Sequence, residues 1–330
     1  METLVHSPRS SLNEVDLLSE RDRKQLWEWN GPWPEPVSEC AHELVSRRML
    51  SQPESPAISS YDGEYSYAEL DVLSKRLAHH LVELGVGPDV IVPLCFEKSA
   101  LAIVAMMGVM RAGGALVFLD PQHPPSRRED IVGQVRAKVV MASPQCTQLF
   151  SFFEGVTLTL SLPFLHELPA HSHAPISKAL PNNIMYVVFT SGSTGRPKGC
   201  LIEHASFCSG SLRHAEGSEL TASSRVAQFA SYAFDVSILE IVTGLIAGAC
   251  ICVPDERAFS RGIATLMTEM RVSWAFLTPS LAKLVSPGEL PYLKTLILGG
   301  EALSSVDIQT WADHVLLVNG YGKHPRIVAS

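Results

Sequence analysis

Hydrophobic and polar positions alternate along the chain in blocks whose periods distinguish helices from strands. The segment AHELVSRRML (41–50) has helical spacing and is followed by Pro53, so we expect an amphipathic helix there. AISSYDGEYSY comes next and contains Asp62–Gly63, which predicts a hairpin turn. A further helix is expected to open at Tyr67 and to end at Gly85, because glycine is a common C-terminal cap.

Short apolar runs then alternate with helical segments. VIVPLCF and GALVFLD have the length of strands and flank the helical LAIVAMMGVMRAG, and a helix over 126–135 precedes the strand AKVVMAS. Further strands are expected near 185–190, 226–230, 249–253, 273–277, 294–298 and 315–318, with helices between them. Strands and helices at this spacing are typical of a parallel sheet. We therefore expect an α/β fold with stacked, mostly parallel sheets flanked by helices.

The composition divides the chain into regions. Residues 1–39 are polar, with clusters of Ser and Pro, and indicate a linker-like arm. The packed domain is expected over 40–322, with a variable stretch at 145–181. Three histidines of that stretch are expected in surface loops, namely His166, His171 and His173.

Charge and cysteine content exclude several classes of function. The chain has 26 basic and 34 acidic residues and lacks a basic stripe, which argues against nucleic acid as a partner. The apolar stretches 101–119 and 241–253 are interrupted or too short to span a membrane, and no export signal is recognised at the N-terminus. Seven irregularly spaced cysteines favour a reducing compartment over a disulfide framework. We expect a soluble, cytoplasmic protein.

The segment MYVVFTSGSTGRPKG (185–199) predicts a strand that runs into a loop rich in hydroxyl groups and glycine. Such a loop can wrap phosphates, because glycine exposes backbone N–H groups, hydroxyls donate hydrogen bonds and Lys198 adds a cation. The loop lacks the frame of a Walker A motif. A solvated Gly/Ser turn is the alternative, but ten specified positions in a row favour a phosphate loop.

The loop TSGSTGRPKG resembles the signature of the adenylate-forming superfamily, which includes acyl-CoA synthetases, luciferases and the adenylation domains of nonribosomal peptide synthetases. Other segments resemble core motifs of these adenylation domains in the expected order: YSYAELD, MRAGGALVFLDP, YAFDVSILEIVTGLIAGACICV, LILGGEAL and VNGYG. LLSERDRKQLWEWN resembles the linker between a condensation and an adenylation domain. The resemblance covers about residues 12–322 and implies the large N-terminal domain of the adenylate-forming fold.

The resemblance also implies a role for each matching residue. The ATP phosphates would be held by Thr190, Ser191, Gly192, Ser193, Thr194, Gly195 and Lys198, with Lys198 and Thr190 supporting catalysis. The adenine would lie near Gly299, Gly300, Glu301, Ala302, Asn319 and Tyr321. Asp235 would pair with the α-ammonium of an amino acid. The side-chain pocket would consist of Val236, Leu239, Phe276, Ile297, Gly299 and Gly320. These residues are apolar or small, so we expect an apolar or aromatic amino acid.

The implied reaction is attack of the amino acid carboxylate on the α-phosphate of ATP, which gives an acyl-adenylate and pyrophosphate. Positioning and charge neutralisation would provide the acceleration. Mg²⁺ would be the metal cofactor, and a carrier domain bearing phosphopantetheine would be the partner in the parent synthetase. Cys250 and Cys252 alternate along a strand with no second ligand pair, so we assign them to the core and predict no metal ligands.

Three of these residues have simpler interpretations. Asp235 could cap a helix over 236–244, Tyr321 could be a core aromatic residue, and Glu301 could be a solvated loop carboxylate.

The resemblance stops after Gly322. The fifth motif of the family continues into Pro-Thr-Glu, whose Glu helps to hold Mg²⁺, whereas KHPRIVAS (323–330) follows here. The ribose-binding Asp, the hinge and the C-terminal domain with its catalytic Lys have no counterpart either. We therefore expect a C-terminally truncated domain that is inactive by itself and has an uncovered sheet edge beyond 315–318. An acyl- or aryl-CoA ligase and a non-catalytic remnant are the alternatives, and Asp235 disfavours the ligase because such acids carry no ammonium group.

Overall fold

The computed structural model describes residues 18–31, 35–171, 173, 175, 177–190 and 196–321, and the backbone of 326–328. Internal contacts divide the chain into two units, residues 1–36 and 37–330. The first unit contributes helix α2 (Glu20–Asn30), which begins with a capping box between Ser19 and Asp22. No side chain of α2 is buried.

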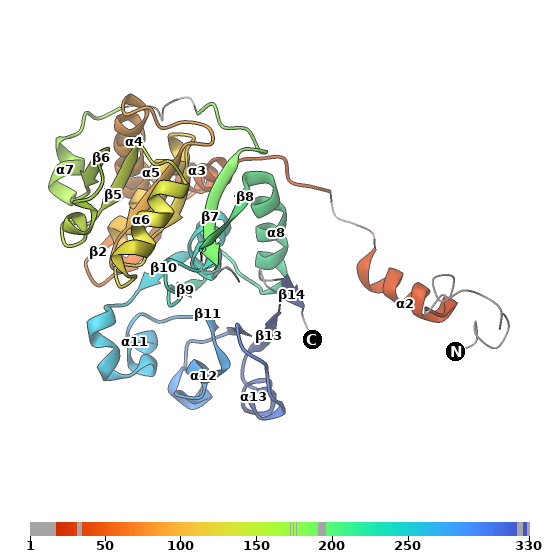
Figure 1. Cartoon of the computed structure of the whole chain (residues 1–330). Coiled ribbons are helices and arrows are strands. Elements are labelled where there is room, and N and C mark those ends of the chain that lie inside the picture. Colours follow the sequence, from red (N-terminus) through yellow and green to blue (C-terminus); the bar gives the residue numbers. More distant parts are fainter. Residues whose placement is uncertain are drawn as a thin grey trace. The chain divides into compact units, whose positions relative to one another are not determined.

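The second unit contains two sheets, both visible in Figure 1. The larger sheet has the strand order β14 (Arg326–Val328), β13 (Leu316–Tyr321), β12 (Thr295–Gly299), β11 (Trp274–Leu277), β9 (Arg225–Ala227), β10 (Cys250–Val253), β1 (Pro56–Ser60) and β2 (Gly63–Ser66). Its described strands pair in parallel, except β1 with β2 and β13 with β14.

The smaller sheet has the order β6 (Val156–Thr159), β5 (Val139–Ala142), β3 (Ile91–Cys95), β4 (Ala115–Phe118), β7 (Ile184–Thr190) and β8 (Lys198–Glu203). Its described strands are parallel except for the antiparallel pair β7 and β8. The expected α/β architecture with mostly parallel sheets is thus confirmed.

Helices connect and cover the strands. The α-helices of this unit are α3 (Ala41–Ser51), α4 (Tyr67–Glu83), α5 (Ala100–Arg111), α6 (Pro125–Gln134), α7 (Leu162–Glu167), α8 (His204–Gly217), α9 (Asp235–Ile238), α10 (Gly244–Ala247), α11 (Ile263–Glu269), α12 (Pro279–Ala282) and α13 (Ser305–Trp311). A π-helical turn, η3 (Leu239–Thr243), joins α9 to α10. Short 3₁₀ turns are η2 (Thr147–Phe150), η4 (Glu256–Arg261) and η5 (Pro287–Glu289).

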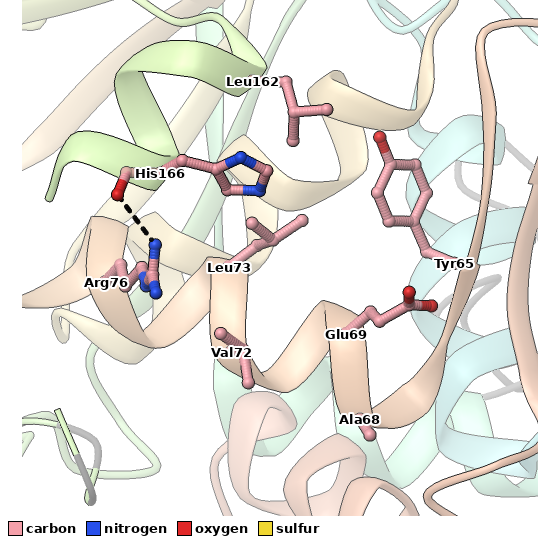
Figure 2. A pocket seen from close by; sticks show the side chains of 8 residues that line it. All are labelled: Tyr65, Ala68, Glu69, Val72, Leu73, Arg76, Leu162 and His166. Atoms are coloured by element: carbon pink, nitrogen blue, oxygen red, sulfur yellow. Dashed lines mark hydrogen bonds between the residues drawn. The ribbon is translucent and has the colours of Figure 1, made fainter. Parts of the chain in front are cut away.

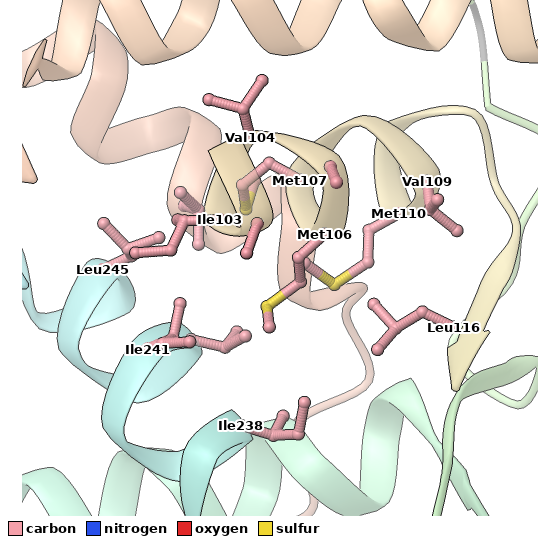
Figure 3. Close-up of a cluster of buried hydrophobic side chains, with 14 of the residues drawn as sticks. Ile103, Val104, Met106, Met107, Val109, Met110, Leu116, Ile238, Ile241 and Leu245 are labelled. Carbon is pink, nitrogen blue, oxygen red and sulfur yellow. The ribbon is translucent and has the colours of Figure 1, made fainter. Parts of the chain in front are cut away.

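Helix α5 lies at the centre of the largest hydrophobic core. All of its residues are buried except Leu101, which is partly buried. Figure 3 shows its Met and branched side chains beside Ile238, Ile241 and Leu245 of the α9–η3–α10 segment. A helix that is apolar all round must be enclosed by protein or lipid. Among the described residues, no helix combines the length and the apolar content that crossing a membrane requires, and α5 is enclosed by protein.

The structure adds elements that the sequence pattern did not predict. Strand β6 and helix α7 lie within the stretch 145–181, so His166 belongs to a helix and its assignment to a loop was wrong. Strand β8 follows the phosphate loop, and its largely exposed side chains explain why no apolar run marked it. The expected uncovered edge is contradicted in part, because the backbone of β14 pairs with Asn319–Tyr321 at the end of β13.

Three buried titratable side chains meet where α3 and α8 begin. The sulfur of Cys40 and one ring nitrogen each of His42 and His204 lie within 4.8 Å of one another. The backbone N–H of Ala41 donates to Nδ1 of His204 at 3.2 Å. Burial lowers the pKa of His42 to about 3 and that of His204 to about 4, and it raises the pKa of Cys40 to about 11. The three groups are therefore neutral near pH 7.

We predict that these histidines make the fold sensitive to mild acid. The unfolded chain protonates them near pH 6.5, whereas the folded chain keeps them neutral down to about pH 4. Their contribution is fully present above pH 6.5 and is lost as the pH falls towards 4. Each histidine should remove about 1–2 kcal/mol between pH 7 and pH 5. The check is the free energy of urea unfolding at both pH values for the native chain and for a His42→Asn/His204→Asn variant. An equal loss in both proteins would contradict the prediction.

Candidate functional site

A cavity of about 460 Å³ lies at the carboxyl ends of parallel strands in the larger sheet. Loops beyond the carboxyl ends of parallel strands are the usual place for ligands in open α/β sheets. The cavity is lined by Phe229, Ala230, Ser231, Phe234, Asp235, Val236, Phe276, Leu277, Thr278, Leu281, Gly299, Gly300 and Gly320. Among these residues Asp235 alone has a charged side chain, and the remaining surface is mainly apolar.

Asp235 is the first residue of α9, and Phe234 occupies the N-cap position. The helix-capping interpretation of Asp235 is therefore wrong, since its position is inside the helix. Its side chain is half-buried and lines the cavity. Burial raises the pKa of Tyr186 in β7, and the negative charge of Asp235 raises it further. This coupling shows that the carboxylate lies within electrostatic reach of the strand that leads into the phosphate loop.

Two glycines let the ring of Phe276 approach the backbone at the cavity wall. A Cβ atom at Gly299 would lie 2.6 Å from the carbonyl oxygen of Gly320 and 2.6 Å from Cζ of Phe276. A Cβ atom at Gly320 would lie 3.0 Å from Cε2 of Phe276 and 3.2 Å from Cγ2 of Ile297. Side chains at either position would therefore displace the ring or enter the cavity.

The structure brings six of the sequence-predicted residues together at this cavity: Asp235, Val236, Phe276, Gly299, Gly300 and Gly320. Two others, Leu239 and Ile297, are buried in the core and do not line it. Their inclusion in the side-chain pocket is not supported by this geometry, although Ile297 packs close behind Gly320.

The residues predicted to lie near adenine occupy the loop after β12 and the end of β13. Glu301 and Ala302 are exposed and Asn319 is half-buried. The Glu301 carboxylate accepts a hydrogen bond from the backbone N–H of Ser280 at 3.0 Å and another from its hydroxyl, and these bonds lower the pKa of Glu301. Tyr321 is 75% exposed, so its interpretation as a core aromatic residue is wrong.

The phosphate loop is flanked by the antiparallel pair β7 and β8. Thr190 and Lys198 are paired in register, and Thr190 Oγ1 donates to the carbonyl oxygen of Lys198 at 3.5 Å. Both residues are exposed, so the hairpin presents a hydroxyl and an ammonium group at the two ends of the loop. The other predicted phosphate ligands, Ser191–Gly195, lie outside the described residues.

Sequence reasoning missed the cavity residues that belong to no motif. These are Phe229, Ala230, Ser231, Leu277, Thr278 and Leu281. Phe234 lies within the FDVS motif but was also missed. Most lie just beyond β9 or β11, and their position after a parallel strand is the signal that could have identified them.

A second hollow lies between α4 and α7 (Figure 2). Its wall is mostly apolar, and Arg76 Nη1 donates to the carbonyl oxygen of His166 at 3.1 Å. It contains none of the residues predicted for ATP or amino acid binding. The candidate site is therefore the cavity around Asp235.

Comparisons with known proteins agree with this geometry. The chain is 48% identical over 323 residues to the nonribosomal peptide synthetase atnA of Emericella nidulans, a match that covers 96% of this chain and 4% of that protein. It is 44% identical over 322 residues to the N-benzoylphenylalaninol synthetase apmA of Penicillium brevicompactum, covering 98% of this chain and 14% of that protein. The chain thus spans a small part of the length of these relatives.

Solved structures share the fold. The AMPPNP-bound form of the nonribosomal peptide synthetase FmoA3 matches with a TM-score of 0.86 and 22% identity over 96% of this chain and 35% of that one. VinN in complex with L-aspartate matches with a TM-score of 0.79 and 18% identity over 89% of this chain and 79% of that one.

A family model decides the classification. The model described as AMP-binding enzyme matches residues 45–323, a range that includes both sheets apart from β14, the phosphate loop and the cavity around Asp235. The fungal synthetases match the same region and more. This chain therefore belongs to the AMP-binding enzyme family, among the adenylation domains of nonribosomal peptide synthetases.

Proposed function

We propose that the cavity binds the amino acid substrate of an ATP-dependent adenylation reaction. The observation that carries the proposal is that residues from three separate motifs, FDVS, LILGGEAL and VNGYG, line one cavity. Asp235 supplies the single negative charge at its wall, which suits the α-ammonium group of an amino acid. An acyl- or aryl-CoA ligase has no use for this charge.

The apolar lining indicates the class of side chain. Phe234, Val236, Phe276 and Leu281 line the cavity together with small residues. A charged substrate side chain would be desolvated there without a partner, which is costly. We therefore propose an apolar or aromatic amino acid.

We propose that ATP lies between the cavity and the phosphate loop. Its phosphates would contact Thr190, Ser191–Gly195 and Lys198, and the adenine would lie against Gly300–Ala302, Asn319 and the exposed ring of Tyr321. Support comes from the exposure of Thr190 and Lys198 at the two ends of the loop. Mg²⁺ would neutralise charge on the phosphates, but the Glu that helps to hold it in the family has no counterpart in KHPRIVAS (323–330).

The proposed reaction forms a bond between the substrate carboxylate and the α-phosphorus and breaks the bond from that phosphorus to the oxygen of the leaving pyrophosphate. Asp235 orients the amino acid through its ammonium group, and Lys198 neutralises phosphate charge. Positioning of two bound reactants lowers the barrier without covalent participation of the protein. Transfer to phosphopantetheine on a carrier domain would belong to the whole synthetase.

The first test concerns Asp235. Leaving a buried ammonium group without its partner costs about 3–5 kcal/mol, so Asp235→Ala should weaken amino acid binding by about a hundredfold or more. Calorimetric titration of residues 1–330 with the twenty amino acids identifies the ligand and then measures the variant. Asp130→Ala, which removes an exposed carboxylate of α6 outside the cavity lining, is the control. Equal binding of the ligand and of its analogue without the amino group would refute this role of Asp235.

A second test concerns the shape of the cavity. Gly320→Ala places a methyl group 3.0 Å from the ring of Phe276 and should shift the preference towards smaller amino acids, by about tenfold for a lost methylene-sized space. Gly210→Ala is the matched control, because a Cβ atom at Gly210 meets nothing within 4 Å. The measurement is the ratio of dissociation constants for a large and a small apolar amino acid, and an unchanged ratio would place the substrate elsewhere.

A third test concerns the phosphate loop. Lys198→Ala removes a charge-assisted contact worth about 1.5–3 kcal/mol, so the chain should bind ATP about tenfold to a hundredfold more weakly. Lys138→Ala, an exposed lysine on the approach to β5, is the control. Binding is the suitable readout, because KHP (323–325) replaces Pro-Thr-Glu and we expect pyrophosphate exchange by this chain to stay at background. Equal ATP affinity in both variants would remove Lys198 from the site.

A further inference from the structure

One wall of the cavity consists of chain that has just left the sheet. β9 ends at Ala227. The N–H of the next residue, Gln228, still donates a hydrogen bond to the neighbouring strand β10, to the carbonyl oxygen of Cys252 at 2.9 Å. Residues 229–231 then line the cavity before the helix begins at Asp235. Backbone groups that leave a sheet lose their partners and must find others when they are buried.

Ala230 finds both of its partners in side chains. Its N–H donates to the carboxylate of Glu240 at 3.2 and 3.3 Å. Its carbonyl oxygen accepts from Nζ of Lys98 at 2.8 Å and from Nε2 of Gln228 at 2.7 Å. The peptide groups on either side of this residue are therefore held from two directions.

Lys98 uses all of its donors on this segment. Nζ donates to the carbonyl oxygen of Gln228 at 3.0 Å, to Oε1 of the same residue at 2.9 Å and to the carbonyl oxygen of Ala230 at 2.8 Å. Three acceptors match the three N–H bonds of an ammonium group. The side chain is 5% exposed, and it comes from the loop between β3 and α5 in the smaller sheet.

Glu240 contacts the same segment, Gln228–Ala230, from another part of the chain. It lies in the π-helical turn η3, is fully buried, and also accepts from Nε2 of Gln228 at 3.1 Å. π-helical turns are rare and occur frequently at functional sites. Glu240 is therefore bound to both Gln228 and Ala230, the two residues that Lys98 also holds.

The next residues are fixed to the same loop of the smaller sheet. The backbone N–H of Ser99 donates to the hydroxyl oxygen of Tyr232 at 3.3 Å. The ring of Tyr232 stacks on Phe118 with centroids 4.7 Å apart, and Nζ of Lys98 lies 5.6 Å from the ring centre. The wall of the cavity is thus attached to the β3–α5 loop on both sides of Ser231.

We propose that Lys98 and Glu240 are positioning residues that clamp the segment Gln228–Tyr232 and thereby set the shape of the amino acid pocket. The inference rests on the proposed function of that pocket. Neither residue lines the cavity, so both act through Ala230 and its neighbours.

Burying two ionisable side chains costs free energy, and this cost supports a role for Lys98 and Glu240 beyond packing. Burial lowers the pKa of Lys98 to about 8, partly offset by the charge of Glu240, and raises the pKa of Glu240 to about 7, partly offset by Lys98. Well-packed apolar side chains often replace buried charges without loss of stability. Apolar side chains would not bind the peptide groups of Ala230, however, so the charged residues provide a defined position for this wall.

The test compares two clamp variants with a buried charge elsewhere in the same core. Lys98→Met and Glu240→Gln should weaken amino acid binding by about tenfold to a hundredfold, because small displacements of positioning groups have effects of this size, while ATP affinity stays within about twofold. Hydrogen exchange of the peptide covering 228–235 should accelerate in both. Arg111→Met is the control: Arg111 pairs with Asp71 at 2.8 Å at the other end of α5, so this variant should lose stability but keep the native affinity and exchange of 228–235.

The two readouts separate the clamp from the proposed function. If no amino acid binds to the native chain, the proposed function is refuted. Faster hydrogen exchange at 228–235 in the clamp variants alone would still support the clamp. The clamp proposal would be overturned if Lys98→Met and Glu240→Gln showed the same hydrogen exchange and amino acid affinity as Arg111→Met. Gln228→Met, which keeps both charges and removes only the bridging amide, tests the same point if either charge variant does not fold, and it should show the same direction of change.

Discussion

The burial of helix α5 is the constraint on which the second unit depends. A helix without a polar face cannot lie at the surface, so other elements must enclose it. Helix α4 approaches closely enough that a Cβ atom at Gly108 would lie 2.5 Å from Leu77. The α9–η3–α10 segment contributes Ile238, Ile241 and Leu245 to the same core (Figure 3). The helix that starts at Asp235 is therefore placed by its packing in this core.

Both ends of α5 carry buried charge, and the two ends have different consequences. At the C-terminal end, Arg111 pairs with Asp71 and also donates to the hydroxyl of Ser74 at 2.8 Å, which joins α5 to α4. Just before the N-terminal end, Lys98 donates to the segment beyond β9. The first interaction connects two helices, and the second connects the core to the wall of the cavity. Only the second interaction therefore connects directly to the site.

The sequence predicted the parts of the fold that apolar runs specify. Central parallel strands such as β4 and β12 are buried along their whole length, so they appear as continuous apolar segments. Edge strands lack this signal: β8 has mostly exposed positions, and β6 has one buried residue, Leu158. The π-helical turn at Glu240 could not be predicted either, because its pattern of apolar residues continues that of the flanking helix.

Sequence motifs predicted only those site residues that lie within a contiguous motif. Asp235 and Gly299 belong to such motifs and line the cavity. Ser231 and Thr278 also line it but belong to no motif, so only their position beyond a parallel strand could have indicated them. Leu239 lies within a motif, yet the helical turn directs it to the core. Lys98 and Glu240 are 142 positions apart in the chain, and local sequence gives no reason to connect them.

The position of the cavity at the end of a parallel sheet explains why Lys98 and Glu240 are buried beside its apolar wall. A pocket at the end of a parallel sheet opens only where a strand stops and the chain diverges from its neighbours. Each residue that diverges loses ladder partners for its N–H and carbonyl groups, and an unsatisfied buried group costs about 1–3 kcal/mol. Water could satisfy those groups, but it would also fill the apolar space. The ammonium group of Lys98 offers only donors, and the carboxylate of Glu240 offers only acceptors. Together they bind the carbonyl oxygen and the N–H of Ala230 without admitting water to the wall of the cavity.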